Sequence, residues 1–498
     1  MKRINISTLF FLTFLVLAYS QTSGQSNWNQ FRGPNGSGVA ENTSALAVEF
    51  DQSNNLIWKT EINDGHSSPC IWGDNIFLTA LNGKILETIC LNKNTGEIKW
   101  KKSIEPERLE RVHPIGHSAT PTPTTDGKGV FVYFGSWGLI CYDFDGNVKW
   151  ERKIPIHPNM YGTAVSPILY KDYLIFSRDT GVPNYKRTEN SSLEAINKEN
   201  GETIWKTDRE GFDANWSTPM FYNNNGVDEL LIYGIWWLKA YSLKDGTELW
   251  AIPGMTDEPC NIPVEGEGLI YLTTYNMKTN TEVIGIPKYS ELLKDYDLDK
   301  DGELTFKEIE PNKSFLSRYD ADGEGDHPLK GFFRFLDKDQ SGKLTSEEWD
   351  EIFKWLDQFK QENALMAIKP GVKGQYDTEV VWRYTKGVPE CPSPIYYKGL
   401  VYMLKNGGIF TCLDAKTGDL KYEEKIGSGG PYYSSPVIGD GKIYTSSARG
   451  VVTVLAVGDK LNILAKNDLK ERIMATPAIV DGVIYVRTQK GLYAFGLN

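Results

Sequence analysis

Two acidic stretches have the residue types and spacing of calcium-binding loops. A 12-residue EF-hand loop presents oxygen ligands at positions 1, 3, 5, 7, 9 and 12, with a glycine at position 6. In the stretch DLDKDGELTFKE, the predicted metal ligands around Gly302 are Asp297, Asp299, Asp301, Glu303 and Glu308. In DKDQSGKLTSEE, those around Gly342 are Asp337, Asp339, Ser341, Lys343 and Glu348. Position 7 binds through its backbone carbonyl, so Glu303 and Lys343 need no side-chain oxygen.

The surroundings of these stretches favour a paired EF-hand. The loops start 40 residues apart, and YSELLKDY before the first has helical spacing. The stretch EEWDEIFKWLDQFKQENALMAI after the second predicts one long amphipathic helix. Two bound Ca²⁺ ions with a structural rather than a regulatory role are therefore expected. The alternative is a pair of acidic turns that bind no metal.

A repeat occupies most of the remaining chain. One half of it is a strand that ends in tryptophan after a Gly turn, as in TGEIKW, DGNVKW, NGETIW and DGTELW. The other half is a Ser/Thr–Pro pair followed by an alternating strand, such as SPILYKDYLIFS. Alternating strands between Asx–Gly turns are typical of hairpins, and four antiparallel strands every 40–50 residues or so form a propeller blade.

The prolines that begin these strands predict eight blades. They are Pro69, Pro121, Pro167, Pro219, Pro263, Pro394, Pro436 and Pro477. The last unit lacks one strand, and NNLIWKTEI near the N-terminus has the matching Trp ending at Trp58. The predicted fold class is all-β: an eight-bladed β-propeller closed by an N-terminal strand, with an inserted α-helical EF-hand pair. The alternative is a seven-bladed ring with the fifth unit displaced.

The spacing also predicts the domain organisation. Pro263 and Pro394 are 131 residues apart, about 80 more than one blade requires, and the acidic loops lie between them. We therefore assign residues 54–283 to blades 1–5 with the closing strand, 284–370 to the EF-hand insertion and 371–498 to blades 5–8, after an N-terminal segment at 21–53.

The first 20 residues have a basic start and an apolar stretch that ends in small residues. This pattern predicts a signal peptide cleaved near Ser20, and the alternative is an uncleaved anchor. No cysteine follows the apolar stretch, so we expect an exported protein, periplasmic or secreted, with no lipid anchor and no transmembrane segment after cleavage.

The residues that begin the innermost strands should face one mouth of the propeller channel. Three positions before each leading proline stand His66, Ser118, Ala164, Trp216, Cys260, Cys391, Tyr433 and Met474. Their neighbours include His117, Tyr161, Glu258, Glu390, Tyr432 and Arg472. This column varies beside constant prolines, which favours a functional rim with the candidates His66, His117, Tyr161, Trp216, Glu258, Glu390 and Tyr433. The alternative is that these side chains only fill a wet channel.

The cysteines do not form a disulfide framework. Cys90, Cys141 and Cys412 share one repeat position at which other blades have alanine, so we expect buried thiols there. Cys260 and Cys391 stand at equivalent positions of adjacent blades, which leaves a bond between them open.

Charge and motifs exclude several function classes. The chain has 54 basic and 65 acidic side chains, a net charge of −11. Residues 289–363 alone carry −9, from 20 acidic and 11 basic side chains. No basic patch indicates nucleic-acid binding, because that requires clustered cationic side chains. GPNGSG at 33–38 lacks the lysine of a phosphate loop and is expected to be a turn.

The opening WNQFRGPNGSG, from Trp28 to Gly38, together with the TGEIKW-type repeats, resembles the pyrroloquinoline-quinone-like propeller repeat family. The resemblance covers nearly the whole mature chain and implies eight blades. Some members are quinone-dependent alcohol or sugar dehydrogenases with calcium and the quinone in the channel. Others, like the outer-membrane assembly lipoprotein, bind no cofactor and dock proteins. This chain has neither the adjacent cysteines of many of the former nor the lipobox cysteine of the latter.

Three functional hypotheses follow. The first is an exported calcium-binding scaffold whose channel mouth binds a protein or glycan partner, without chemistry of its own. The second is an oxidoreductase that uses pyrroloquinoline quinone, with Trp216 stacking on the cofactor. The third is a carbohydrate-active propeller enzyme whose rim His or Tyr abstracts a proton. We favour the first of these.

Overall fold

The computed structural model describes residues 27–497, except for residues 158, 160, 181–190, 210–214, 257, 276–285, 312, 314–327, 357–362 and 377–378. The predicted signal peptide lies outside the described residues. Among the described residues, no helix has both the length and the apolar character needed to cross a membrane.

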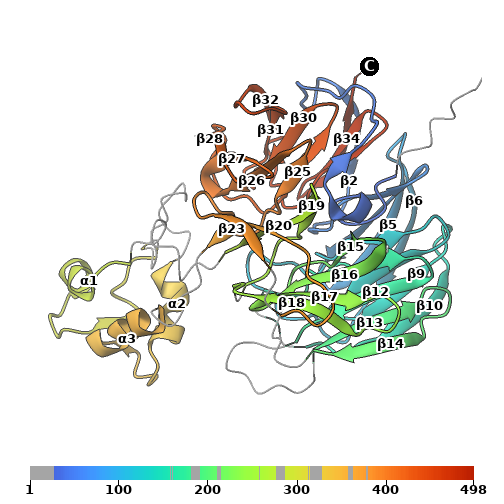
Figure 1. Ribbon diagram of the computed structural model, residues 1–498. Helices are drawn as coiled ribbons and strands as arrows, with labels where there is room; N and C mark the ends of the chain where they lie inside the picture. The colour runs from blue at the N-terminus through green and yellow to red at the C-terminus, as the bar shows by residue number, and fades with distance from the viewer. Residues whose placement is uncertain are drawn as a thin grey trace, which may run out of the picture.

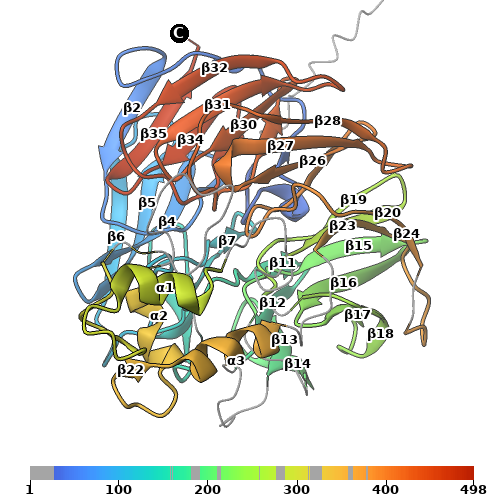
Figure 2. The same ribbon diagram turned by 90° about the vertical axis from the view of Figure 1, so that its left-hand side faces the viewer.

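Eight four-stranded antiparallel sheets surround one axis, which confirms the predicted eight-bladed propeller (Figures 1 and 2). Blades 1 to 4 contain β3 (Cys70–Trp72), β4 (Asn75–Asn82), β5 (Ile85–Asn92), β6 (Ile98–Ile104); β7 (Thr124–Thr125), β8 (Val130–Phe134), β9 (Gly138–Tyr142), β10 (Val148–Lys153); β11 (Ile168–Tyr170), β12 (Tyr173–Arg178), β13 (Ser192–Asn197), β14 (Thr203–Asp208); β15 (Met220–Asn224), β16 (Val227–Gly234), β17 (Trp237–Ser242) and β18 (Glu248–Pro253).

The other blades follow in chain order, and the first strand of each blade lies innermost. Blades 5 to 8 contain β19 (Val264–Gly266), β20 (Leu269–Thr274), β23 (Ala364–Ile368), β24 (Val380–Tyr384); β25 (Ile395–Tyr397), β26 (Leu400–Lys405), β27 (Ile409–Asp414), β28 (Leu420–Lys425); β29 (Val437–Gly439), β30 (Lys442–Ser446), β31 (Val451–Ala456), β32 (Ile463–Asp468); β33 (Ala478–Val480), β34 (Val483–Arg487) and β35 (Gly491–Gly496). A short 3₁₀ turn, η2 (Asn406–Gly408), joins β26 to β27.

Blade 8 is completed from the other end of the chain. Strand β2 (Leu56–Glu61) pairs antiparallel with β35, and Trp58 lies opposite Ala494. This confirms the predicted N-terminal closing strand. Strand β1 (Val39–Ala40) adds a fifth strand to blade 7, parallel to β29. The two ends of the chain therefore meet in neighbouring blades, and the ring has no open edge there.

The α-helices that the described residues form all lie between the second and third strands of blade 5. They are α1 (Tyr289–Tyr296), α2 (Leu329–Leu336) and α3 (Ser346–Leu356), with the short strands β21 (Leu304–Thr305) and β22 (Lys343–Leu344). Figure 1 shows these helices standing apart from the blades. They have a hydrophobic core of their own, with Leu292, Phe333 and Trp349 among its buried members.

The prediction of one long helix after the second acidic loop is wrong at the C-terminal end of that stretch. Helix α3 ends at Leu356, and ALMAI at 364–368 forms β23 opposite β20. Met366 packs on blade 4, whereas Leu365 packs on blade 6, so both faces of the strand are buried. A short apolar run buried on both faces has no alternation, and it therefore cannot be distinguished from a buried helix by pattern. Blade 5 thus takes its third strand from inside the range predicted for the insertion.

Hydroxyl groups next to the leading prolines form a ring of hydrogen bonds around the channel. In seven of the eight blades, the backbone N–H of the residue before the leading proline donates to the hydroxyl of the equivalent residue in the next blade. The seven bonds, 2.9–3.1 Å long, are Ser68 to Thr122, Thr122 to Ser166, Ser166 to Thr218, Ile262 to Ser393, Ser393 to Ser435, Ser435 to Thr476 and Thr476 to Ser68. The last bond joins blade 8 to blade 1. Ile262 has no hydroxyl, and blades 4 and 5 are joined instead by Ser217 Oγ, which donates to the Asn261 carbonyl at 2.7 Å.

This ring corrects the predicted register of blade 2. Strand β7 begins directly after Pro123, as every other innermost strand begins directly after its own proline. Pro123 therefore leads blade 2, whereas the prediction took Pro121. The TPTP sequence offers two Thr–Pro pairs, and only the hydrogen bonds of Thr122 distinguish them. The residue three positions before the proline is consequently Thr120 and not Ser118.

Tryptophans join the blades at their outer strands. The indole N–H of Trp58, Trp100, Trp150, Trp205 and Trp382 donates to a backbone carbonyl in the turn of the next blade at 2.8–3.2 Å. Each ring also covers a glycine of that turn: at Gly96, whose φ is +74°, an added Cβ would lie 2.5 Å from Trp58. The repeated glycine turns and tryptophans of the sequence thus form a contact between neighbouring blades.

The N-terminal segment crosses the channel. Gly33 and Gly36 have φ values of 71° and 67° around η1 (Pro34–Gly36), so GPNGSG forms the expected turn. Its contacts reach five blades. Hydrogen bonds join Trp28 to Ile71 of blade 1, Asn29 to Thr125 of blade 2, Asn35 to Phe221 of blade 4 and Arg32 to Pro394 at blade 6. Strand β1 pairs with β29 of blade 7. This motif therefore ties the inner strands together.

The hydroxyl ring makes a testable contribution to stability. In Ser68→Ala the buried N–H of Thr476 loses its acceptor, which costs about 1–3 kcal/mol. We expect a lower urea midpoint by circular dichroism, with Ser103→Ala on the exposed side of β6 as the matched control. Equal midpoints for Ser68→Ala and Ser103→Ala would show that the ring does not stabilise the closed propeller.

Candidate functional site

The channel contains a cavity of about 170 Å³ that opens at its mouth. One residue of every blade lines it, always three positions before the leading proline: His66, Thr120, Ala164, Trp216, Cys260, Cys391, Tyr433 and Met474. Hydroxyl residues of the ring, such as Ser68 and Ser435, also line it. The repeat therefore brings residues far apart in the sequence to one surface.

Six of the seven predicted rim candidates line this cavity. They are His66, Tyr161, Trp216, Glu258, Glu390 and Tyr433. The seventh, His117, lies just behind, with its ring centroid 4.9 Å from that of His66. Tyr432 is buried, its hydroxyl donates to the Ser428 carbonyl at 2.5 Å, and it is not among the residues that line the cavity.

Sequence reasoning missed several of the lining residues, among them Phe31, Thr120 and Tyr275. Phe31 reaches the cavity from the N-terminal segment, Thr120 from blade 2 and Tyr275 from the end of β20. The register error hid Thr120, although the paired Thr–Pro pattern offered it as an alternative. Phe31 and Tyr275 lie outside the repeated column, and no spacing in the sequence indicates them.

Aromatic and acidic side chains share one part of the cavity. Tyr161 meets Trp216 edge to face, with ring centroids 5.1 Å apart. The Trp216 indole N–H donates to Asn159 Oδ1 and to the Gly162 carbonyl, both at 2.9 Å, which fixes the ring. Burial raises the pKa of Tyr161 well above its usual value, and the nearby carboxylates of Glu258 and Glu390 raise it further. The described lining residues include no Lys or Arg.

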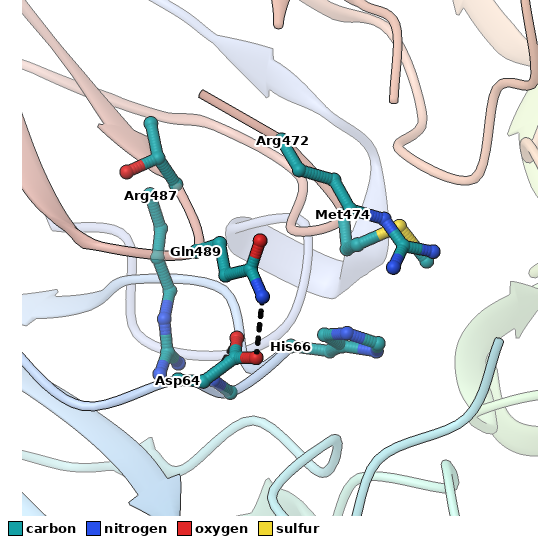
Figure 3. Close-up of a pocket in the computed structure, with 8 residues that line it drawn as sticks. Asp64, His66, Arg472, Met474, Arg487 and Gln489 are labelled. Atoms are coloured by element: carbon teal, nitrogen blue, oxygen red, sulfur yellow. Dashed lines mark hydrogen bonds between the residues drawn. The ribbon is translucent and has the colours of Figure 1, made fainter. Parts of the chain in front are cut away.

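The opposite side of the channel is basic. A smaller pocket lies beside the main cavity, and His66 and Met474 line both. Figure 3 shows its side chains, which include Asp64, Arg472 and Gln489. Gln489 Nε2 donates to Asp64 Oδ2 at 3.2 Å there. Arg487 is buried, and its guanidinium donates to the Ser67 carbonyl at 2.9 Å, so it holds the start of blade 1. Burial lowers the pKa of Arg487 to about 9.

His66 and His117 form a neutral pair beside this basic group. Burial lowers the pKa of His66 well below its usual value, and the charges of His117 and two arginines lower it further. Burial also lowers the pKa of His117, although Asp64 opposes that shift. The backbone N–H of Ala119 donates to His117 Nδ1 at 3.1 Å. A ring nitrogen accepts a hydrogen bond only when it carries no proton, so Nδ1 is unprotonated.

In each acidic loop, the carboxylate oxygens of three residues point toward one common position. Carboxylate oxygens of Asp297, Asp299 and Glu308 lie within 4.8 Å of one another, and so do those of Asp337, Asp339 and Glu348. Gly302 and Gly342, at position 6, have φ values of 85° and 82°. Their N–H groups donate to the first aspartate of the same loop at 3.0 Å. Strands β21 and β22 pair the two loops, with Leu304 opposite Leu344.

Two oxygen atoms in these loops are buried without a hydrogen-bond partner: Asp297 Oδ1 and Asp337 Oδ1. Each belongs to position 1 of its loop, where an EF-hand aspartate binds the ion directly. A buried carboxylate oxygen without a donor is costly unless a cation lies against it. The donor set, all hard oxygens, suits Ca²⁺.

Asp301 differs from the other predicted ligands. Its Oδ2 lies 2.6 Å from Lys343 Nζ, which reaches across from the second loop and also contacts Glu303 at 2.7 Å. The hydrogen bond from Lys343 lowers the pKa of Asp301. The structure therefore places Asp301 in an ion pair between the loops. Ser341 Oγ accepts the Lys343 N–H at 3.2 Å, as position 5 of the second loop.

Comparison with known proteins identifies the family. A family model described as "Outer membrane protein assembly factor BamB" matches residues 86–253 and 374–497, more than half of the chain. The chain belongs to this family. The matched ranges comprise blade strands on both sides of the helices, in agreement with the pyrroloquinoline-quinone-like repeat.

Curated relatives match over a shorter stretch. Outer membrane protein assembly factor BamB of Salmonella typhimurium is 23% identical over 99 residues, 20% of this chain and 24% of the relative. The Escherichia coli protein of the same name is 22% identical over the same length. The match thus spans about a quarter of the length of these relatives, 24%.

Solved structures share the fold. A europium-containing methanol dehydrogenase has a TM-score of 0.55 at 11% identity, over 95% of this chain and 98% of that one. A quinohemoprotein alcohol dehydrogenase from Pseudomonas putida HK5 has a TM-score of 0.50 at 11% identity, over 95% and 80% of the two chains. Identity this low shows the architecture alone.

The cavity residues do not fit a pyrroloquinoline quinone. That cofactor is a tricarboxylate, and Glu258 and Glu390 would repel it where the described lining offers no Lys or Arg. Trp216 is already engaged with Tyr161, whose ring lies nearly perpendicular to its own, at 77°. Among the described residues, the acidic groups that converge on a common point lie in the two loops and not in the cavity.

The lowered pKa values of the histidine pair predict a pH-dependent stability. Unfolded histidine has a pKa of about 6.5. Because the folded values are lower, the unfolded chain binds more protons below pH 6.5, and stability should fall as the pH drops from 7 to 5. We expect His66→Gln to lose part of this slope, about 1–2 °C in Tm across that range, in thermal melts at each pH. Parallel curves for the two proteins would contradict this assignment.

Proposed function

We propose that this chain is an exported calcium-binding propeller scaffold that binds a protein partner at the mouth of its channel. The observation that carries the proposal is the cavity, in which every blade contributes one side chain to a common surface. Pockets that combine fixed aromatic rings with a few polar groups are typical of binding sites. The family description, an assembly factor, favours a protein over a glycan as the partner.

The chemistry of the cavity suggests what such a partner presents. Trp216 and Tyr161 offer aromatic rings, and Glu258 and Glu390 offer carboxylates on the same side. A Lys or Arg side chain satisfies both, through cation–π contact and through charge-assisted hydrogen bonds. We therefore infer that a loop of the partner inserts a cationic side chain into this side of the cavity.

We propose that Ca²⁺ binds in the helical insertion and not in the cavity. Both loops have the glycine geometry, the converging carboxylates and the partnerless position-1 oxygens of an EF-hand pair. Extracellular EF-hand modules bind Ca²⁺ with dissociation constants of about 0.1–1 mM. In an exported protein such loops are largely filled, so we propose a structural role for the two ions. The predicted signal peptide supports the export that this requires.

Substitution of one glutamate tests the calcium sites. Glu348→Gln removes one oxygen charge of the bidentate position 12 and should weaken the second loop about tenfold or more. Isothermal titration with Ca²⁺ measures this, and Glu347→Gln, one residue earlier and exposed, is the matched control. The propeller signal in circular dichroism should remain unchanged. Equal binding by both variants, or loss of the sheet in Glu348→Gln, would contradict the proposal.

Site-specific crosslinking tests the partner site. With p-benzoylphenylalanine at Tyr433 in the cavity we expect a covalent adduct with one protein in the native cells, and none from the exposed Tyr376 outside it. Glu258→Gln combined with Glu390→Gln should reduce the Tyr433 adduct about tenfold, because the partner's cation loses its counter-charges. Adducts of equal yield from both crosslinker positions, or no effect of the double substitution, would refute a channel-mouth site.

A further inference from the structure

Two thiols face each other on the wall of the cavity. Cys260 and Cys391 occupy the same position in blades 5 and 6, and both line the cavity. Two residues further on, the Ile262 N–H donates to Ser393 Oγ at 2.9 Å, which holds the two segments in register. The neighbouring Cys391 side chain is the main cause that raises the pKa of the Cys260 thiol well above its usual value, and Cys260 Sγ donates to the Glu258 carbonyl at 3.4 Å. The two thiols are therefore neighbours in the reduced chain.

The other four cysteines have no such arrangement. Cys70, Cys90, Cys141 and Cys412 are buried, and each packs into the apolar core of its blade. Burial raises the pKa of Cys90 to about 12, and the pKa of Cys260 is raised too, so it is access to the cavity and not thiolate character that distinguishes the pair. Cys260 and Cys391 are only partly buried and open to a cavity that admits small molecules. An oxidant therefore reaches this pair first.

The position of the pair matters for blade 5. This blade carries the helical insertion, and the hydroxyl ring is interrupted at its border with blade 4, because Ile262 has no hydroxyl. Trp250 of blade 4 donates to Glu229 of its own blade at 2.7 Å instead of to blade 5. Blade 5 is joined to blade 4 by other contacts, such as the bonds from Ser217 to Asn261 and from Gly374 to Leu249, and it keeps its ring bond to Ser393 of blade 6. A bond between Cys260 and Cys391 would close a loop of 131 residues that contains all of blade 5 and the insertion.

We propose that Cys260 and Cys391 form a reversible disulfide that fastens blade 5 to blade 6. The oxidant is a disulfide compound. The thiolate of one cysteine attacks it, displaces one thiolate and forms a mixed disulfide. The thiolate of the second cysteine then displaces the other half. One S–S bond forms, one is reduced to two thiols, and the two electrons leave with the oxidant. Closure of so long a loop restricts the unfolded chain and stabilises the folded one.

The test uses the full chain, purified and fully reduced, then equilibrated with oxidised glutathione. Alkylation in denaturant followed by mass spectrometry counts the thiols. We expect the six thiols to fall by two, with one linked peptide pair that contains Cys260 and Cys391. Cys90→Ala, which copies the alanine of other blades at this position, should retain the bond, whereas Cys391→Ser should lose it.

The oxidised chain should also have a higher Tm than the reduced chain, by about 2–4 °C, and Cys391→Ser should abolish the difference. Six free thiols after oxidation, glutathione adducts without a linked pair, or a pair that involves another cysteine would each overturn the proposal. Equal Tm values would overturn the fastening of blade 5. None of these readouts depends on calcium or on the partner, so failure here is distinguishable from failure of the proposed function.

Discussion

The hydrogen bonds between blades at the channel are the constraint on which the rest of the structure depends. Each hydroxyl next to a leading proline accepts the N–H of the preceding blade, and the bond from Thr476 to Ser68 closes the circle. Every bond is buried, so losing its acceptor leaves an unsatisfied donor. The ring also sets the height of each innermost strand. Residues three positions before the prolines therefore reach the same level and line one cavity.

Blade 5 departs from the pattern of the other blades in three ways. Its ring position is Ile262, the preceding Trp250 stays within its own blade, and its second and third strands are separated by the helices. Pairing two strands interrupted in this way costs additional conformational entropy, because a long loop must close before their contacts form. The same blade borders the Cys260–Cys391 pair. The irregular blade is thus the one for which an added covalent link has the largest effect.

The functional features occupy separate parts of the chain with different chemistry. The acidic loops gather hard oxygen donors in a small helical unit with its own core. The cavity presents aromatic rings and two carboxylates, and Arg472 and Arg487 line a separate, smaller pocket beside it. Membership in the assembly-factor family and fold likeness to dehydrogenases leave both binding and catalysis open at the level of fold. The cavity side chains favour binding of a cation over binding of a tricarboxylate cofactor.

Local sequence patterns by themselves predicted the propeller fold and the two acidic loops. The repeat, the closing strand with Trp58 and the loop spacing follow from turn chemistry and alternation, which act over a few residues. Tertiary structure alone decided the register of blade 2, the strand at 364–368 and the diversion of Asp301 to Lys343. Each depends on a partner far away in the sequence: a hydroxyl in the next blade, two blades that bury both strand faces, and a lysine of the other loop. Such partners leave no signal within a short window of sequence, so only the folded chain reveals them.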